Sequence, residues 1–143
     1  MTTTQEADSK AIFRRAMEAT NSHDWELISK TFEELFAPDV VLHNPVPTRV
    51  KGLDAVKEVF SSLHAAFPDL RVDIDDLIVE RDKVVGRQTV SGTNLGDFMG
   101  RPATGKPVSY EEIFIFRIAG GRIAEIWGVV DVLSQLRQLG SIP

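Results

Sequence analysis

Alternating side chains near the C-terminal end of the chain are the first candidates for chemistry. Every second residue of an extended strand points to the same face. A strand over residues 122–130 would therefore place four side chains together: Glu125, Trp127, Val129 and, just beyond its end, Asp131. An aromatic ring beside a carboxylate is a suitable surface for acid–base catalysis, which predicts Asp131 as the catalytic residue. A second interpretation has equal weight, because aspartate directly before an apolar helical run is a favoured N-cap.

The neighbours of this strand depend on the turn at Gly120-Gly121. A two-residue turn would place Glu112 on the face of Asp131, whereas a three-residue turn with a glycine bulge would place Glu111 there instead. We favour the bulged turn. Glu111 therefore joins the candidate site.

Three further polar residues are candidates for substrate binding. His43 and Asn44 end a short predicted strand before Pro45, where polar side chains commonly line the mouth of a pocket. A buried structural role for His43 has equal weight. Arg87 lies on another predicted strand and faces either the cavity or solvent, and solvent is the commoner environment for arginine.

Composition and motif spacing exclude several other chemistries. The chain has no cysteine, so it holds no disulfide, thiolate metal site or cysteine nucleophile. Its three histidines lack the spacing of a helical zinc site, so no metal is expected. The run from Gly100 to Lys106 resembles a phosphate-binding loop, but Pro107 stands where serine or threonine is required. A net charge of −5 disfavours nucleic acid and anionic membranes as partners.

The elements that must position these residues are helices first and strands afterwards. Apolar side chains that recur every three or four residues predict three amphipathic helices, at residues 8–20, 24–36 and 53–66. A short strand at residues 40–42 separates the last two. Runs rich in β-branched and aromatic residues then predict four long antiparallel strands, at residues 70–80, 83–93, 108–118 and 122–130. A short closing helix is expected from Leu133, Leu136 and Leu139.

This order predicts one α+β domain over residues 1–143, in which three N-terminal helices pack against a curved antiparallel sheet of four strands. A strongly curved sheet encloses a pocket on its concave side, where small ligands bind. We expect the lining to include Phe13, Met17, Phe60 and Trp127. The other face, carrying Ile126 and Val130, should be apolar enough to pair two subunits as a homodimer.

Several fragments stand in an order and spacing typical of one known family. They are VVLHNP at residues 40–45, AFPDL at 66–70, TVSGT at 89–93, GRIAEIW at 121–127, and Asp131 followed by QLG at 138–140. With these fragments the chain resembles the SnoaL-like polyketide cyclases, a branch of the nuclear-transport-factor and ketosteroid-isomerase superfamily. The resemblance spans nearly the whole chain and implies a cone-shaped α+β barrel.

The resemblance also implies an enzyme that uses no cofactor. In the cyclases of this family, an aspartate at the position matched by Asp131 acts as base and acid in an intramolecular aldol closure. Donors such as Asn44 or His43 would hold the enolate oxygen. The implied partner is a small apolar or carbonyl-containing organic molecule.

Two alternatives stay open. One is a small-molecule-binding protein without catalysis. The other is an isomerase or epoxide hydrolase of the same fold, the latter using Asp131 and Arg87. Because the chain shows no signal segment and no apolar run of about 18 residues, the default expectation is a cytoplasmic protein that spans no membrane.

Overall fold

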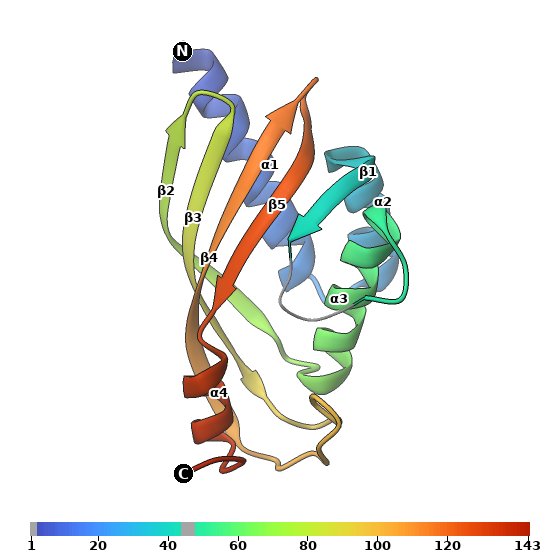
Figure 1. The fold of residues 1–143 in the computed structure, drawn as a ribbon, viewed down its shortest axis with the longest axis vertical. Coiled ribbons are helices and arrows are strands. Elements are labelled where there is room, and N and C mark those ends of the chain that lie inside the picture. The colour runs from blue at the N-terminus through green and yellow to red at the C-terminus, as the bar shows by residue number, and fades with distance from the viewer. Residues whose placement is uncertain (1–2, 44–47) are drawn as a thin grey trace.

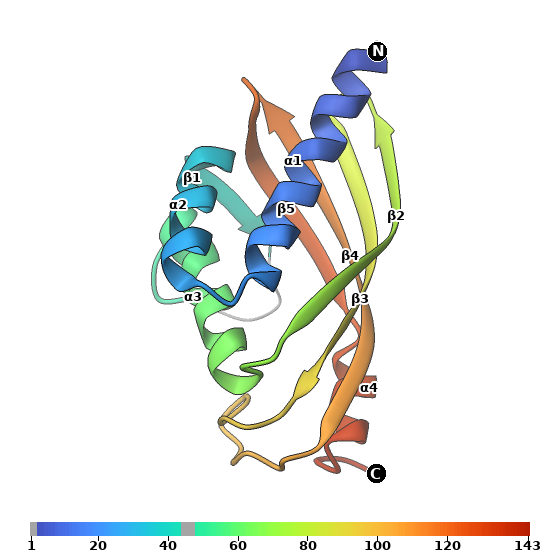
Figure 2. The same ribbon diagram turned by 180° about the vertical axis from the view of Figure 1, so that it is seen from behind.

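A curved five-stranded sheet forms the frame of the molecule, and helices cover one of its faces (Figure 1, Figure 2). The computed structural model describes residues 3–43 and 48–143. The elements are α1 (Thr3–Asn21), α2 (Trp25–Leu35), β1 (Phe36–His43), α3 (Gly52–Ala66), β2 (Arg71–Glu80), β3 (Lys83–Thr93), β4 (Pro107–Ala119), β5 (Arg122–Val130) and α4 (Val132–Gln138). The α+β class expected from the sequence is confirmed.

The strand order is β1-β5-β4-β3-β2. Strands β2 to β5 form the expected antiparallel meander, but β1 adds a fifth strand that runs parallel to β5. The expectation of four antiparallel strands is wrong in this respect, because β1 begins at Phe36 and satisfies backbone groups that β5 would otherwise expose at its edge. The two edge strands, β1 and β2, do not pair with each other, so the sheet is not closed into a barrel.

The helices end close to the expected residues, and α2 and α3 also begin close to them. The carboxylate of Asp24 accepts hydrogen bonds from the backbone N–H groups of Glu26 and Leu27 and so caps α2. Helix α1 begins at Thr3 rather than near residue 8, because the polar residues before its apolar stripe continue the helix. No helix within the described ranges is long and apolar enough to span a membrane.

Helix α1 lies against the concave face of the sheet, behind the strands in Figure 1 and in front of them in Figure 2. The ring of Phe13 packs on Gly86 of β3, where an added Cβ would lie 2.1 Å from its Cζ. Its ring centroid is also 4.7 Å from that of Phe116. Phe13 and Met17 are therefore parts of the packed core, and the expectation that they line the cavity is not met.

The hairpin between β4 and β5 decides which side chains face the cavity. Gly120-Gly121 forms a two-residue turn with positive φ at both positions, so the three-residue turn expected from the sequence is wrong. The bulge expected at the turn lies within β5 instead. Ile118 pairs with Ile123, but Arg117 pairs with Glu125, which leaves Ala124 without a cross-strand partner.

After this bulge, the odd-numbered residues of β4 and β5 share the outer, uncovered face of the sheet. Glu111 is among them, and its carbonyl accepts a hydrogen bond from the Asp131 N–H. The even-numbered residues face the concave side. Ile126 and Val130 consequently line the cavity, and the expectation that they form an outer dimerisation face is wrong.

Candidate active site

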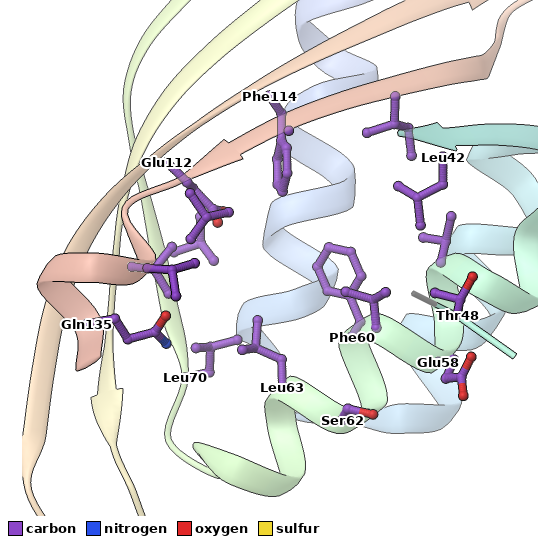
Figure 3. A pocket seen from close by; sticks show the side chains of 18 of the residues that line it. Leu42, Thr48, Glu58, Phe60, Ser62, Leu63, Leu70, Glu112, Phe114 and Gln135 are labelled. Carbon is purple, nitrogen blue, oxygen red and sulfur yellow. The ribbon is translucent and has the colours of Figure 1, made fainter. Parts of the chain in front are cut away.

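A cavity of about 320 Å³ lies between the concave face of the sheet, α3, α4 and the loop after β3 (Figure 3). This volume is within the range of small-molecule sites. Its wall is mainly apolar and comes from every strand: Phe36, Leu42, Val72, Val90, Phe114, Phe116, Ile126 and Val130 among others. Phe60 of α3 lines it as well, as expected from the sequence.

One carboxylate, that of Glu112, lies at the buried end of this apolar cavity. Glu112 is 7% exposed, and its Oε1 accepts a 2.6 Å hydrogen bond from Gln88 Nε2. Burial raises the pKa of Glu112 to about 7, and the hydrogen bond from Gln88 acts in the opposite direction. No lysine or arginine of the described ranges lines the cavity. The carboxyl group therefore changes its protonation near neutral pH.

Two further polar side chains, Tyr110 and Gln135, lie at the same end. Burial and the Glu112 carboxylate both raise the pKa of Tyr110, which keeps its phenol neutral, while the nearby Gln135 amide acts the other way. Gln135 is 1% exposed and comes from α4. Figure 3 shows Glu112 and Gln135 at one end of the cavity and Thr48 and Glu58 at the other.

This arrangement suits proton transfer to and from carbon. A carboxyl group with a pKa near working pH can both accept and return a proton. The apolar wall keeps water away and strengthens electrostatic interactions inside the cavity. Among the described residues, no group of three or more His, Asp or Glu side chains is arranged to hold a metal ion.

His43 joins the cavity to the outer face. It is one of the lining residues, its Nε2 lies 2.7 Å from Glu125 Oε2, and its ring stacks on Trp127 with a centroid separation of 5.2 Å. Hydrogen bonds from His43 and Arg117 lower the pKa of Glu125. Trp127 itself is on the outer face and does not line the cavity, contrary to expectation, because only the even-numbered residues of β5 face inward after the bulge.

Asp131 caps the last helix. Its Oδ1 accepts a 3.0 Å hydrogen bond from the backbone N–H of Ser134, and the residue is exposed and outside the cavity lining. The structure thus shows Asp131 as an N-cap, which is one of the two interpretations drawn from the sequence. A catalytic role for Asp131 stays a prediction.

Arg87 and Glu111 also lie on the outer face. Arg87 Nη1 is 3.2 Å from Glu111 Oε1, and its Nη2 is 3.0 Å from Asp76 Oδ2. This ion-pair group does not line the cavity. Asn44, the remaining candidate, lies outside the described residues.

Sequence reasoning left Glu112 as the alternative to Glu111 and missed Gln135 altogether. Tyr110, Glu112, Phe114 and Phe116 alternate along β4, and an acid within an otherwise aromatic face was the signal that could have identified Glu112. Gln135 had no comparable signal, because the leucines around it suggested a different buried stripe.

Comparison with known proteins shows the family of the chain. The family model described as SnoaL-like polyketide cyclase matches residues 10–139. The chain belongs to this family.

Two curated relatives of this SnoaL-like chain are aklanonic acid methyl ester cyclases. DnrD of Streptomyces peucetius is 28% identical over 132 residues, which cover 90% of this chain and 88% of DnrD. DauD of Streptomyces sp. (strain C5) is also 28% identical, with 90% of this chain and 80% of DauD covered. Their names support a cyclase-type enzyme.

Solved structures support the fold. TsrD from Streptomyces laurentii superposes with a TM-score of 0.85 at 30% identity, covering 95% of this chain and 97% of TsrD. A SnoaL-like protein from Jannaschia sp. CCS1 reaches a TM-score of 0.86 at 21% identity, covering 100% of this chain and 99% of its own, and this likeness concerns the fold alone.

Proposed function

We propose that this protein is an acid–base enzyme that closes a ring within a small polyketide-like carbonyl compound, with Glu112 as the proton-transfer group. The observation that carries the proposal is a carboxyl group with a pKa of about 7 in an apolar cavity that no lysine or arginine of the described ranges lines. The two cyclase relatives support the reaction class.

The proposed reaction is an intramolecular aldol addition. The Glu112 carboxylate takes a proton from the carbon next to a carbonyl, and the electron pair of the broken C–H bond forms an enolate. The enolate carbon attacks a second carbonyl of the same molecule, and the new C–C bond closes the ring. The resulting alkoxide takes the proton back from Glu112. Because only protons and one carbon–carbon bond change, the reaction requires no cofactor.

The apolar wall favours this reaction in two ways. It selects a substrate with an extended apolar body, since the lining of β4 and β5 offers aromatic and aliphatic side chains around the acid. It also raises the basicity of the ionised Glu112, because a carboxylate in a dry environment is poorly stabilised by solvent.

The proposal is tested with Glu112→Gln, and Glu111→Gln is the matched control. The control removes the neighbouring glutamate, which is exposed on the opposite face of β4. With aklanonic acid methyl ester as the first probe, Glu112→Gln should lower the cyclisation rate about a hundredfold or more, and Glu111→Gln should leave it nearly unchanged. A Glu112→Gln variant with full activity would overturn the proposal.

We also propose that two copies associate through the outer sheet face. Ile113 and Val129 are direct cross-strand partners there, and they are 41% and 73% exposed. Val41 on β1, which pairs with Glu125 of β5, is also 49% exposed. Paired apolar side chains at the centre of an uncovered sheet are typical of a surface that is buried by association.

A further inference from the structure

The buried end of the cavity contains a hydrogen-bond donor without an acceptor. Gln135 Nε2 is fully buried, and no residue of the described ranges accepts a hydrogen bond from it with acceptable geometry. The Gln135 amide lies near the Tyr110 hydroxyl and lowers the pKa of that phenol, but the distance and angle between the two groups are not those of a hydrogen bond that satisfies Nε2. Unsatisfied buried donors lower stability and are rare in native proteins, so each requires an explanation.

We propose that Gln135 is a substrate-binding residue whose Nε2 donates a hydrogen bond to the carbonyl oxygen of a ketone or ester placed beside Glu112. This inference rests on the proposed function, since it assigns the oxygen whose neighbouring carbon loses a proton. Figure 3 supports the geometry, because the Gln135 amide points into the cavity at the end where the Glu112 carboxyl group lies.

The surroundings select a neutral oxygen. Glu112 lies at the same end of the cavity as Gln135, and no lysine or arginine of the described ranges lines the cavity to balance a second negative charge. A carboxylate or phosphate at this position would be repelled by the ionised base. A carbonyl oxygen carries no net charge in the ground state, and it gains negative charge only when Glu112 has taken the proton and become neutral. The amide donor then stabilises the enolate that forms.

Helix α4 fixes the position of this donor. It directly follows β5, and the Asp131 cap orders its first turn through the Ser134 N–H. On this proposal Asp131 positions Gln135 by capping α4.

The test uses 9-fluorenone and fluorene, two rigid three-ring compounds that differ in one carbonyl group. Neither can be enolised, so binding is measured without turnover. At pH 9, where Glu112 is ionised and cannot donate, wild-type protein should bind 9-fluorenone about threefold to tenfold more tightly than fluorene, the range of one neutral hydrogen bond. The carbonyl stretching band of bound 9-fluorenone should lie at lower frequency than in an alkane.

Gln135→Leu should abolish both effects, whereas Tyr110→Phe should keep the shifted band. A preference and a band shift that persist in Gln135→Leu would overturn the inference, as would an alkane-like band in the wild-type complex. The carbonyl band of 9-fluorenone bound to wild-type protein can be measured without any variant. If Gln135→Leu does not fold, Gln135→Met takes its place.

The proposed function is tested separately by Glu112→Gln. If the carbonyl preference depends on Gln135 but Glu112→Gln still turns over substrate, the assignment of the base fails and this inference stands. If Glu112→Gln loses activity while Gln135→Leu keeps the carbonyl preference, the assignment of Glu112 as the base stands and the inference about Gln135 fails.

Discussion

Gln88 and Glu112 are direct cross-strand partners on β3 and β4, and their side chains are joined by a 2.6 Å hydrogen bond at the buried end of the cavity. The bond occupies Glu112 Oε1. No residue of the described ranges is hydrogen-bonded to Oε2. The pair therefore orients a carboxyl group by one oxygen and leaves the other for a ligand.

The pH dependence of catalysis should follow Glu112. Its pKa of about 7 means that the base becomes ionised as pH rises through neutrality. We expect kcat/KM to increase with pH and to level off above about pH 8, with a midpoint near 7. Rates measured from pH 5 to 9 check this. A flat profile, or a midpoint near pH 4, would indicate a different base.

The free energy of unfolding should fall as pH rises, in the opposite direction to the catalytic rate. The pKa of Glu112 is raised from 4.5 to about 7 on folding, so the folded state binds more protons between these values. The contribution is fully present below about pH 4.5 and is lost as pH rises through 7. By linkage this amounts to roughly 3 kcal/mol, as an upper value for one group.

Glu112→Gln should remove this dependence. The variant should be more stable than wild type at pH 8 and about equally stable at pH 4, in urea unfolding measured by circular dichroism. Glu111→Gln is the control for loss of a carboxylate in general. Equal stability of wild type and Glu112→Gln at both pH values would show that Glu112 is not perturbed by burial.

Substitutions of Asp131 should separate capping from direct catalysis. Asp131→Ala should lower the free energy of unfolding by about 1 kcal/mol, whereas Asp131→Asn, which can still accept the Ser134 N–H, should cost much less. If Asp131 only positions α4, the Asn variant keeps most of its activity. A loss of about a hundredfold in Asp131→Asn, with unchanged thermal stability, would instead support Asp131 as the acid–base residue.

The contact between Phe13 and Gly86 should be intolerant of a methyl group. Gly86→Ala would force the Phe13 ring away from the sheet, and we expect a loss of about 1–3 kcal/mol in the free energy of unfolding. The double variant Phe13→Leu/Gly86→Ala should lose less than the sum of the two single changes, because the shorter side chain leaves room. Additive losses in chemical denaturation would contradict the contact.

Association through the outer face is tested at its most exposed apolar residue. Val129→Glu should convert a dimer into a monomer in sedimentation experiments, because a buried unpaired carboxylate at a twofold-related surface is strongly unfavourable. Glu80→Gln, an exposed change at the far end of β2, is the control. A wild-type protein that sediments as a monomer at micromolar concentration would remove the proposal.

Periodicity was sufficient to predict the helices and the long strands, because the apolar positions of each must face one core. It was not sufficient to predict which face of β5 lines the cavity. Ile123 and Ile126 are both buried although they are three residues apart, and strict alternation cannot place both on one face. That spacing indicates a bulge, but the residue types near the turn suggested a longer loop.

The buried side of α4 was equally beyond prediction. Three leucines at positions 133, 136 and 139 suggested the buried stripe, yet Leu133 is 53% exposed and Gln135 is buried. The orientation of so short a helix is set by the strand that precedes it and by its Asp131 cap, which sequence spacing does not encode.

The bulge at the unpaired Ala124 decides which side chains of β5 reach the cavity. If Ala124 paired with Arg117 instead of bulging out, every later residue of β5 would move one position along β4 and exchange faces. Trp127 and Glu125 would then turn inward and Ile126 and Val130 outward. Relatives of the same length that lack this bulge between the Gly120-Gly121 turn and Trp127 would thus carry nearly the same residues and yet present a different interior to their ligands, so alignments across this hairpin should be made by strand pairing rather than by residue identity.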